Sequence, residues 1–281
     1  MAVGEIVTQQ AQQDVLLSAR VSVRYGDKPA VLRDVDLQIR KGEILGLIGQ
    51  SGSGKSTMAL AILGLLDRKR THSEGTIQFD GCELLNLPER DLRSLRGRKI
   101  ALVLQSPLSS LNPALKIRTQ LTEAWRAHAS GSGSDCNRAI GEALESVSLP
   151  SNDDFLRKYP SEMSIGQAQR VLIAMAVLHR PALLITDEAT SALDVITQSE
   201  ILALFRDLNR SFGMAILYIS HDLASVAGIC DRVAILHEGR IVESGNTVQV
   251  LTRPQNDYTR RLMAAMPKMP QLSEASKAAS V

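Results

Sequence analysis

Cysteine and aromatic residues are scarce in this chain of 281 residues. It contains three cysteines, and phenylalanine, tryptophan and tyrosine together make up 3% of it. Cys82, Cys136 and Cys230 lie far apart, without the spacing of a metal site. We therefore expect three reduced thiols in a cytosolic protein, and neither a disulfide framework nor a zinc site.

Long apolar runs are also missing. No run reaches the roughly 18 apolar residues that a membrane-spanning helix needs. Residues 1–14 have neither the basic segment nor the apolar segment of a signal peptide. These absences predict a cytosolic protein whose membrane role, if it has one, depends on a partner.

Charge of one sign is not in excess, since 32 Lys and Arg face 30 Asp and Glu and give a net charge of +2. This balance does not indicate a nucleic-acid partner. One basic group is made up of Arg90, Arg93, Arg96, Arg98 and Lys99. Because Glu89 and Asp91 are interleaved with it, we interpret this group as a solvated helix face and expect no nucleic acid.

A glycine-rich loop gives the strongest positive signal. Residues 49–56 match the phosphate-loop pattern G-x-x-x-x-G-K-[ST] at every fixed position. A buried strand is predicted before the loop, at 43–48, and an apolar helix after it, at 55–66. The predicted nucleotide-binding residues are Gly49, Gln50, Ser51, Gly52, Ser53, Gly54, Lys55, Ser56 and Thr57. A chance Gly/Ser-rich loop is the alternative, and the flanking strand and helix disfavour it.

The residue types of this loop suit a nucleoside triphosphate with its metal. The glycines allow backbone turns that point N–H groups at phosphate oxygens, and the following helix directs its positive end there. Lys55 adds a full positive charge for the β- and γ-phosphates. The Ser56 hydroxyl is placed to bind Mg²⁺. We therefore expect ATP and Mg²⁺ as the cofactors.

A second motif supplies acidic groups. Residues 182–188 read as a buried strand that ends in Asp187 and Glu188. Ligands of α/β folds bind where strands end. Asp187 suits the metal shell and Glu188 suits the polarisation of an attacking water. A solvated acidic turn is the alternative, which the phosphate loop makes less favourable.

The pattern along the chain predicts a mostly parallel α/β sheet with an inserted helical part. Expected strands cover 15–23, 31–39, 44–48, 75–81, 100–104, 182–186, 214–219 and 232–236. Expected helices include 171–179 and 197–211. Residues 106–159 are mostly helical but are interrupted by a Gly/Ser run, Ser130–Ser134, that we predict to be a flexible loop.

These elements suggest three parts. Residues 14–105 and 181–250 form an ATP-binding core, and residues 106–180 form a helical subdomain. Residues 251–281 form a C-terminal extension, whose tail from Leu272 we expect to be disordered. The fold class is a P-loop NTPase (RecA-like) core with a β-rich nucleotide-binding subdomain and an inserted α-helical subdomain.

From about Tyr25 to Gly245 the chain resembles the nucleotide-binding subunit of an ABC transporter. Seven motifs occur in the order of that family. Beyond the phosphate loop and the acidic strand, they are Tyr25 for adenine stacking, Gln105 of the Q-loop, residues 163–167 of the signature motif, residues 191–194 of the D-loop and residues 220–222 around the switch histidine. Each of these five motifs is weak alone, but together, in register with the phosphate loop and the acidic strand, they are specific.

The resemblance implies roles for these residues. Gln105 contacts the metal and senses the membrane partner, and His221 contacts the γ-phosphate. Without the resemblance, Tyr25 would more often be a packing residue and His221 a structural one. The signature residues Ser164, Gly166 and Gln167 and the D-loop residue Asp194 close over ATP bound to another subunit. A head-to-tail dimer of ATPase subunits is therefore implied.

Two positions depart from the family pattern. Ile165 stands where the signature motif has its first glycine, and a β-branched side chain resists positive φ. If the backbone freedom of glycine matters, the site will be slow; if the side chain points away from phosphate, nothing is lost. Ala189 stands where proline commonly follows the catalytic glutamate, and we expect it to be tolerated.

Two segments resemble the oligopeptide, dipeptide and nickel importer ATPases, namely Ser110–Pro113 and, in part, Arg253–Leu262. The implied partners are a second ATPase subunit, identical or homologous, transmembrane permease subunits and, indirectly, an extracytoplasmic substrate-binding protein. The implied location is the cytoplasmic face of the cell membrane. No cysteine follows Cys230, so we expect no iron–sulfur cluster.

Three alternatives stay open. The chain could be a mainly regulatory ATP-binding half of a heterodimer, as Ile165 suggests. It could be a soluble ABC ATPase of DNA repair or translation, although it has neither a long coiled coil nor two ATPase halves. It could also serve an exporter, against which the importer-like segments argue.

Overall fold

The computed structural model describes residues 14–265, so the expectations for residues 1–13 and for the tail from Leu272 lie outside the described residues. The strands are β1 (Val15–Tyr25), β2 (Leu32–Arg40), β3 (Ile44–Ile48), β4 (Thr71–Phe79), β5 (Cys82–Glu83), β6 (Ile100–Val103), β7 (Leu183–Asp187), β8 (Ala215–Ser220), β9 (Arg232–His237) and β10 (Arg240–Asn246). The helices are α2 (Lys55–Ile62), α3 (Glu89–Leu95), α4 (Pro107–Ser110), α5 (Ile117–Arg126), α6 (Gly133–Ser146), α7 (Asp153–Leu156), the 3₁₀ helix η1 (Pro160–Glu162), α8 (Ile165–Val177), α9 (Val195–Phe212), α10 (Leu223–Ile229), α11 (Thr247–Thr252) and α12 (Asp257–Ala264).

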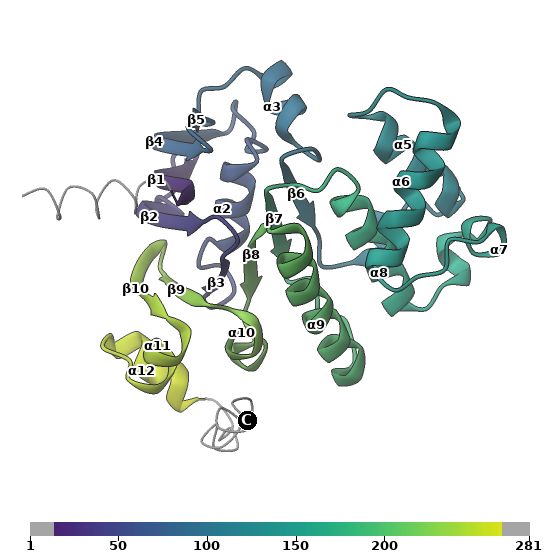
Figure 1. Ribbon diagram of the computed structural model, residues 1–281. Coiled ribbons are helices and arrows are strands. Elements are labelled where there is room, and N and C mark those ends of the chain that lie inside the picture. The colour runs from purple at the N-terminus through teal and green to yellow at the C-terminus, as the bar shows by residue number, and fades with distance from the viewer. Residues whose placement is uncertain (1–13, 266–281) are drawn as a thin grey trace, which may run out of the picture.

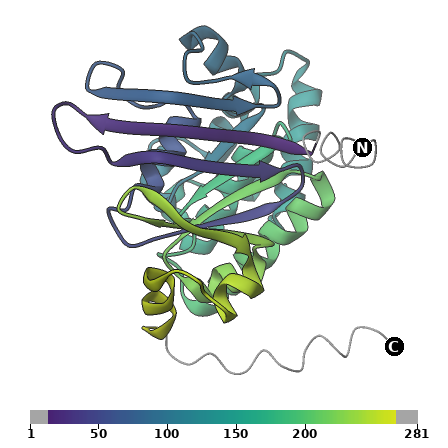
Figure 2. The ribbon, with the colours of Figure 1, turned by 90° about the vertical axis from the view of Figure 1, so that its left-hand side faces the viewer.

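An antiparallel sheet of four strands, in the order β2-β1-β4-β5, forms one outer layer (Figures 1 and 2). Its strands alternate between buried and exposed residues, as in β2, where Val35, Leu37 and Ile39 are buried and the residues between them are exposed. This period of two is what a sheet with one solvated face requires. The buried face packs on α2, which lies between the two sheets.

The central sheet has six strands in the order β10-β9-β3-β8-β7-β6. All neighbours are parallel except β10, which pairs antiparallel with β9. Strands β3 and β8 are buried throughout, as expected for strands covered on both faces. In β3, Leu45 and Leu47 face the core around α2, while Ile44 and Ile48 face the core with α9 and α10. The predicted mostly parallel sheet is confirmed.

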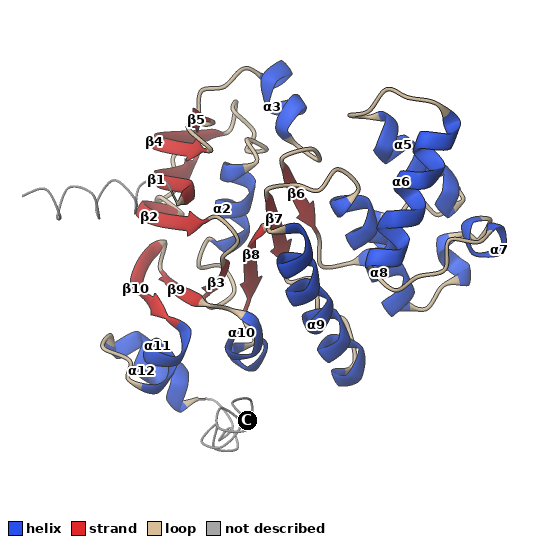
Figure 3. Cartoon of the chain, in the orientation of Figure 1, coloured by secondary structure: helices blue, strands red, loops and turns tan. Residues whose placement is uncertain are grey.

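Only helices occupy the chain between β6 and β7, and Figures 1 and 3 show α5 to α8 gathered on one side of the molecule. The flexible loop predicted at Ser130–Ser134 is wrong in its second half, because α6 begins at Gly133. Ser132 caps this helix: its Oγ accepts from the N–H of Asp135 at 3.2 Å, and its own N–H donates to the Asp135 carboxylate at 3.1 Å. Within residues 14–265 no helix is long and apolar enough to cross a membrane.

The C-terminal part of the described chain adds β10, α11 and α12, which are not among the strands and helices predicted above. Helix α12 packs back on the sheet, where the ring of Tyr258 stacks on that of His237 with centroids 3.7 Å apart. The Glu243 carboxylate accepts the N–H groups of Gln255 and Asn256 just before this helix. Residues 251–265 are thus held against β9 and β10.

Candidate active site

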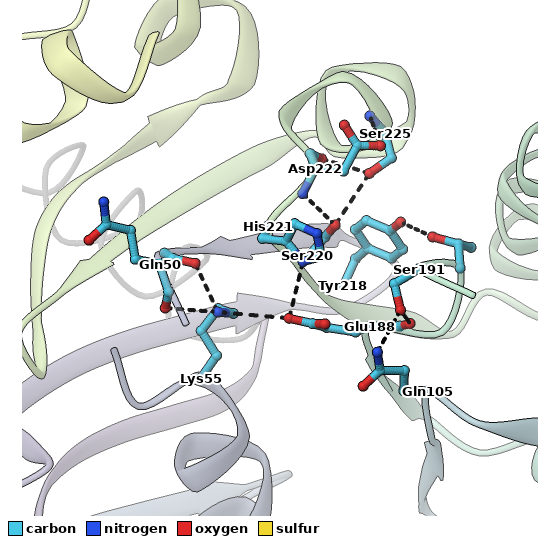
Figure 4. A network of polar contacts seen from close by, with 12 residues as sticks. Gln50, Lys55, Gln105, Glu188, Ser191, Tyr218, Ser220, His221, Asp222 and Ser225 are labelled. Carbon is cyan, nitrogen blue, oxygen red and sulfur yellow. Dashed lines mark hydrogen bonds and ion pairs between the residues drawn. The ribbon is translucent and has the colours of Figure 1, made fainter. Parts of the chain in front are cut away.

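The predicted residues of the phosphate loop meet Glu188 and His221 at one edge of the central sheet. Strands β3, β8 and β7 are parallel neighbours, so their carboxyl ends lie together. The phosphate loop follows β3, Glu188 follows β7, and His221 follows β8 (Figure 4). Parallel pairing therefore brings three distant stretches of sequence to one place, where open α/β sheets bind ligands.

Two glycines of the phosphate loop are required by close packing or backbone conformation. A Cβ at Gly49 would lie 2.3 Å from the carbonyl oxygen of Leu236. Gly54 has φ +110°, and a Cβ there would lie 2.6 Å from Leu32. Side chains at either position would displace the loop from the sheet, so its N–H groups depend on these glycines.

Lys55 is held inside the loop. Its side chain is 6% exposed, and its Nζ donates to the carbonyl oxygens of Gly49 at 2.8 Å and Gln50 at 3.1 Å. Burial lowers the pKa of Lys55, while the charges of Glu188 and Asp187 act in the opposite direction. A cation only partly neutralised by carbonyl dipoles is suited to bind phosphate.

Glu188 adopts a left-handed backbone conformation, with φ 52°. For a residue other than glycine this conformation costs about 1–3 kcal/mol. Its N–H donates to the Ile219 carbonyl at 3.0 Å, which fixes the turn against β8. Its Oε1 lies 4.0 Å from the Lys55 Nζ and 3.2 Å from Nδ1 of the largely exposed His221. The carboxylate therefore lies between a cation and an imidazole, at the mouth of the phosphate loop.

Asp187 offers an oxygen ligand for a cation. Its Oδ1 is buried and has no hydrogen-bond partner among the described residues. Burial raises the pKa of Asp187, a hydrogen bond with Ser56 lowers it, and the charge of Glu188 raises it again. A buried carboxylate oxygen without a partner, beside a serine hydroxyl, fits Mg²⁺, which prefers oxygen ligands and one or two carboxylates.

Gln105 reaches the same edge, but its hydrogen bond goes to another residue of the site. Its Nε2 donates to the Oγ of Ser191 at 2.9 Å. Ser191 belongs to the D-loop but was not among the predicted site residues. In the sequence, Ser191 is marked only by its position three residues after Glu188. That position does not predict a contact with Gln105, which lies 86 positions away.

A cavity of about 250 Å³ lies beside the phosphate loop. Its lining consists of Tyr25, Val31, Ser51, Gly52, Gly54, Lys55, Ser56, Thr57 and Glu188. Tyr25 is half-buried, and its hydroxyl lies 3.5 Å from Oγ1 of Thr57. The structure thus places Tyr25 at the wall of the cavity, where a ring face can meet a base. Val31 is a lining residue that the sequence did not reveal.

The signature residues form the start of helix α8 rather than a turn before a later helix. The predicted start at Val171 is wrong, because Ser164 caps the helix and its Oγ accepts the N–H of Gln167 at 3.2 Å. Ile165 is the first helical residue, without positive φ, and its side chain is 46% exposed. The isoleucine therefore points toward solvent, and its backbone needs none of the freedom of glycine.

The D-loop end lies next to the signature end. Asp194 caps α9 and accepts the N–H groups of Ile196 and Thr197, both at 3.1 Å. A Cβ at Gly166 would lie 2.9 Å from Cγ2 of Thr197, so the two helix starts are in close contact. Within residues 14–265, none of the signature residues lines the cavity beside the phosphate loop.

The fold and this edge of the sheet define a P-loop NTPase. Residues 32–191 match the family model described as ABC transporter. The chain belongs to the ABC transporter family. The predicted membership of this family and the predicted fold class are thereby confirmed.

Curated relatives are similar in sequence to this chain over most of its length. It is 45% identical over 268 residues to the "Peptidoglycan transport ATP-binding protein YejF" of Agrobacterium fabrum, covering 93% of this chain and 49% of the relative. It is 42% identical over 265 residues to the oligopeptide transport ATP-binding protein OppD of Escherichia coli, covering 92% and 78%. It is 39% identical over 251 residues to the dipeptide transport ATP-binding protein DppD of Haemophilus influenzae, covering 88% and 76%. The chain thus spans about half the length of the first relative.

Solved structures show the same architecture. A dimeric, post-hydrolysis ATP-binding cassette bound to ADP and Pi matches with a TM-score of 0.70 and 29% identity, over 82% of this chain and 98% of that chain. The structure of cbiO1 from Clostridium perfringens, part of the ABC transporter complex cbiONQ, matches with a TM-score of 0.74 and 26% identity, over 90% of this chain and 96% of that chain.

Proposed function

We propose that this chain hydrolyses ATP to power an importer of peptides. The observation that carries the proposal is the convergence of Lys55, Asp187, Glu188 and His221 at one sheet edge. The relatives described above are named for oligopeptides, dipeptides and peptidoglycan, which favours a peptidic cargo over nickel or a metal–chelator complex.

In the proposed mechanism the loop N–H groups and Lys55 bind the phosphates, and the Tyr25 ring stacks on adenine. Glu188 polarises the attacking water, and His221 donates to an oxygen of the γ-phosphate. Both side chains are already in contact at 3.2 Å, so each limits the orientation of the other. Catalysis of phosphoryl transfer rests mainly on such positioning and on electrostatic stabilisation.

Mg²⁺ would be held by three oxygen donors, namely the Ser56 hydroxyl, the unpartnered Oδ1 of Asp187 and the amide oxygen of Gln105. When bound, the ion neutralises charge that develops on phosphate oxygens. The Ser56 hydroxyl lies near enough to Asp187 to lower the pKa of this carboxyl group, so two of the three donors are close together before the ion binds.

The signature and D-loop residues are proposed to act on a second subunit. Ser164, Gly166, Gln167 and Asp194 lie at two adjacent helix starts outside the cavity of their own chain. A head-to-tail dimer, of identical or homologous ATPases, would bring them to the partner's nucleotide, and a dimeric cassette is among the structural neighbours.

Further partners and location follow from this proposal. Residues 106–180 would act as a helical subdomain that contacts transmembrane permease subunits at the cytoplasmic face of the membrane. An extracytoplasmic binding protein would deliver the peptide. The core would comprise residues 14–105 and 181–250, with residues 251–281 as the extension. No role for nucleic acid is proposed.

ATP turnover of the purified chain across a concentration series, with Glu188→Gln in parallel, tests the proposal. Turnover that rises with protein concentration and disappears in the variant supports a self-sufficient dimer. ATP binding without turnover at any concentration supports the regulatory alternative, or an obligatory second ATPase. Turnover that Glu188→Gln leaves unchanged contradicts the assigned site.

A further inference from the structure

Ser191 connects two residues of the proposed site that follow different strands, namely Gln105 after β6 and Glu188 after β7. Its Oγ accepts a hydrogen bond from Nε2 of Gln105 at 2.9 Å and donates one to the carbonyl oxygen of Glu188 at 3.0 Å. Figure 4 shows the hydroxyl between the Gln105 amide and the Glu188 backbone. The segment after β6 is thereby joined to the turn that carries the catalytic carboxylate.

The chemistry of the three groups fixes the orientation of the amide. A serine hydroxyl has one hydrogen, and a carbonyl oxygen can only accept. When that hydrogen goes to Glu188, Oγ can only accept from Gln105, which must then present its Nε2. In the reverse orientation the amide would present Oε1 to Ser191 and accept the hydroxyl hydrogen. The hydrogen bond to the Glu188 carbonyl would then be lost, and only one of the two bonds would remain. Within residues 14–265 no protein donor reaches the Gln105 Oε1.

The hydroxyl is itself held by a well-anchored turn. The Glu188 carbonyl also accepts the backbone N–H of Ser191 at 3.1 Å. Behind the turn, the Thr190 hydroxyl lies 3.0 Å from the hydroxyl of the fully buried Tyr218. Two hydrogen bonds from Ser191 and one buried pair therefore fix the position from which the hydroxyl acts.

We propose that Ser191 is a positioning residue that turns the Oε1 of Gln105 toward the cation site of Asp187 and Ser56. An amide oxygen is a suitable ligand for Mg²⁺, whereas an amide N–H repels a cation. Without the Ser191 hydroxyl, the amide of this exposed side chain rotates between the two orientations. The inference rests on the proposed function, since it takes Gln105 to be a metal ligand.

Three variants test this role. Ser191→Ala removes the hydroxyl, and Ser191→Thr retains it. Ser94→Ala is a matched control, because the Ser94 hydroxyl also donates to a carbonyl three residues earlier, that of Asp91, on α3 away from the site. The measurements are the Mg²⁺ concentration that gives half-maximal ATP turnover, the Kd for ATP in EDTA, and the solvent exchange of the Gln105 side-chain amide by NMR in metal-free, ¹⁵N-glutamine-labelled protein.

Ser191→Ala is expected to raise the half-saturating Mg²⁺ concentration about three- to tenfold, the effect of one lost hydrogen bond. It should speed exchange of the Gln105 amide and leave the Kd for ATP in EDTA unchanged. Ser191→Thr and Ser94→Ala should behave as the wild type does in all three measurements.

The inference is overturned if Ser191→Ala and Ser94→Ala have the same Mg²⁺ dependence, or if the Gln105 amide exchanges at the wild-type rate in Ser191→Ala. A loss of ATP affinity in EDTA would show that Ser191 only supports the nucleotide pocket, which also overturns it. If the wild type shows no Mg²⁺-dependent turnover, the proposed function fails instead, and the NMR measurement still decides whether Ser191 orients Gln105.

Discussion

Two regions of this molecule differ in whether the chain itself covers their side chains. We call them the phosphate-loop end, residues 49–57, and the signature end, which consists of residues 163–167 and the adjacent start of α9. Lys55 is 6% exposed and is held by carbonyl oxygens of its own loop. At the signature end, Ile165, Val195 and Ile196 are 46%, 81% and 74% exposed. One chain therefore completes the first end by itself, whereas the second presents apolar side chains that only another surface can bury.

This difference separates two kinds of residue within one proposed mechanism. Substitutions at the phosphate-loop end should change chemistry or metal binding in each subunit. Substitutions at the signature end should change association and depend on protein concentration. Four sets of variants test this division, beginning with the largest expected effect.

Glu188→Gln is expected to lower the turnover number about 10²- to 10⁴-fold, because an amide cannot act as a general base. ATP binding should persist, since Lys55 and the loop N–H groups remain. Single-turnover hydrolysis and equilibrium ATP binding measure the two quantities. A variant that loses binding and turnover together would show that Glu188 chiefly maintains the fold of this end.

Ile165→Asp is expected to weaken ATP-dependent dimerisation about ten- to a hundredfold, because association would bury a charge. The fold should be unaffected, since an acidic residue is favourable in the first turn of a helix. Leu65→Asp is the control, because Leu65 is equally exposed, at 46%, but lies after α2. Sedimentation of both variants with ATP measures their dimerisation constants. Equal constants would contradict the assignment of dimer contacts to the signature end.

Asp187→Asn is expected to stabilise the metal-free protein while weakening Mg²⁺-ATP binding. The folded pKa of Asp187 is raised above its ordinary value of 3.8, so the folded state binds more protons than the unfolded chain. The free energy of unfolding therefore falls as pH rises from 3.8 through the folded pKa, and the ionised group is destabilising at neutral pH.

Removal of the negative charge from this half-buried side chain, whose Oδ1 has no partner among the described residues, should raise the free energy of unfolding in EDTA at pH 7 by about 1–2 kcal/mol. Urea denaturation at pH 7 and at pH 4 measures it, and the gain should shrink at the lower pH. A variant less stable than the wild type at pH 7 would show that Asp187 is a structural residue and not one kept for a cation.

Gly141→Ala and Gly166→Ala give the smallest effect. Nothing lies within 4 Å of a Cβ at Gly141, so alanine in the middle of α6 should stabilise the protein by about 0.5–1 kcal/mol. A Cβ at Gly166 would meet Cγ2 of Thr197 at 2.9 Å, which should offset that gain. Thermal unfolding of both variants checks this, and equal gains would show that α8 and α9 separate easily.

Sequence patterns were most reliable where they act locally. The strand before the phosphate loop, the helix after it and the buried stripe of α9, made up of Ile201, Leu204, Phe205 and Leu208, are confirmed. Two helix starts were missed although their signals were present. Ser132 and Ser164 each precede, by three residues, a side chain that completes a capping box. The Gly/Ser composition around Ser132 indicated a loop, and the family motif indicated a turn at Ser164, so neither cap was predicted.

Strand β10 and the contact of α12 with β9 were harder to foresee. Residues 240–246 are mostly half-exposed and lack clear alternation, so pairing with β9 decides their conformation. The stacking of Tyr258 on His237 joins an extension to the sheet and has no local pattern.

The residues of the proposed site could be identified from the sequence alone, because phosphate binding requires glycine, lysine and serine at spacings that local backbone geometry imposes. Tertiary structure alone decided which of them meet. It set Glu188 in a left-handed conformation beside His221, turned Ile165 to solvent and brought Ser191 to Gln105. These contacts depend on the order and register of parallel strands, which are fixed by packing across the whole core and not by any one segment.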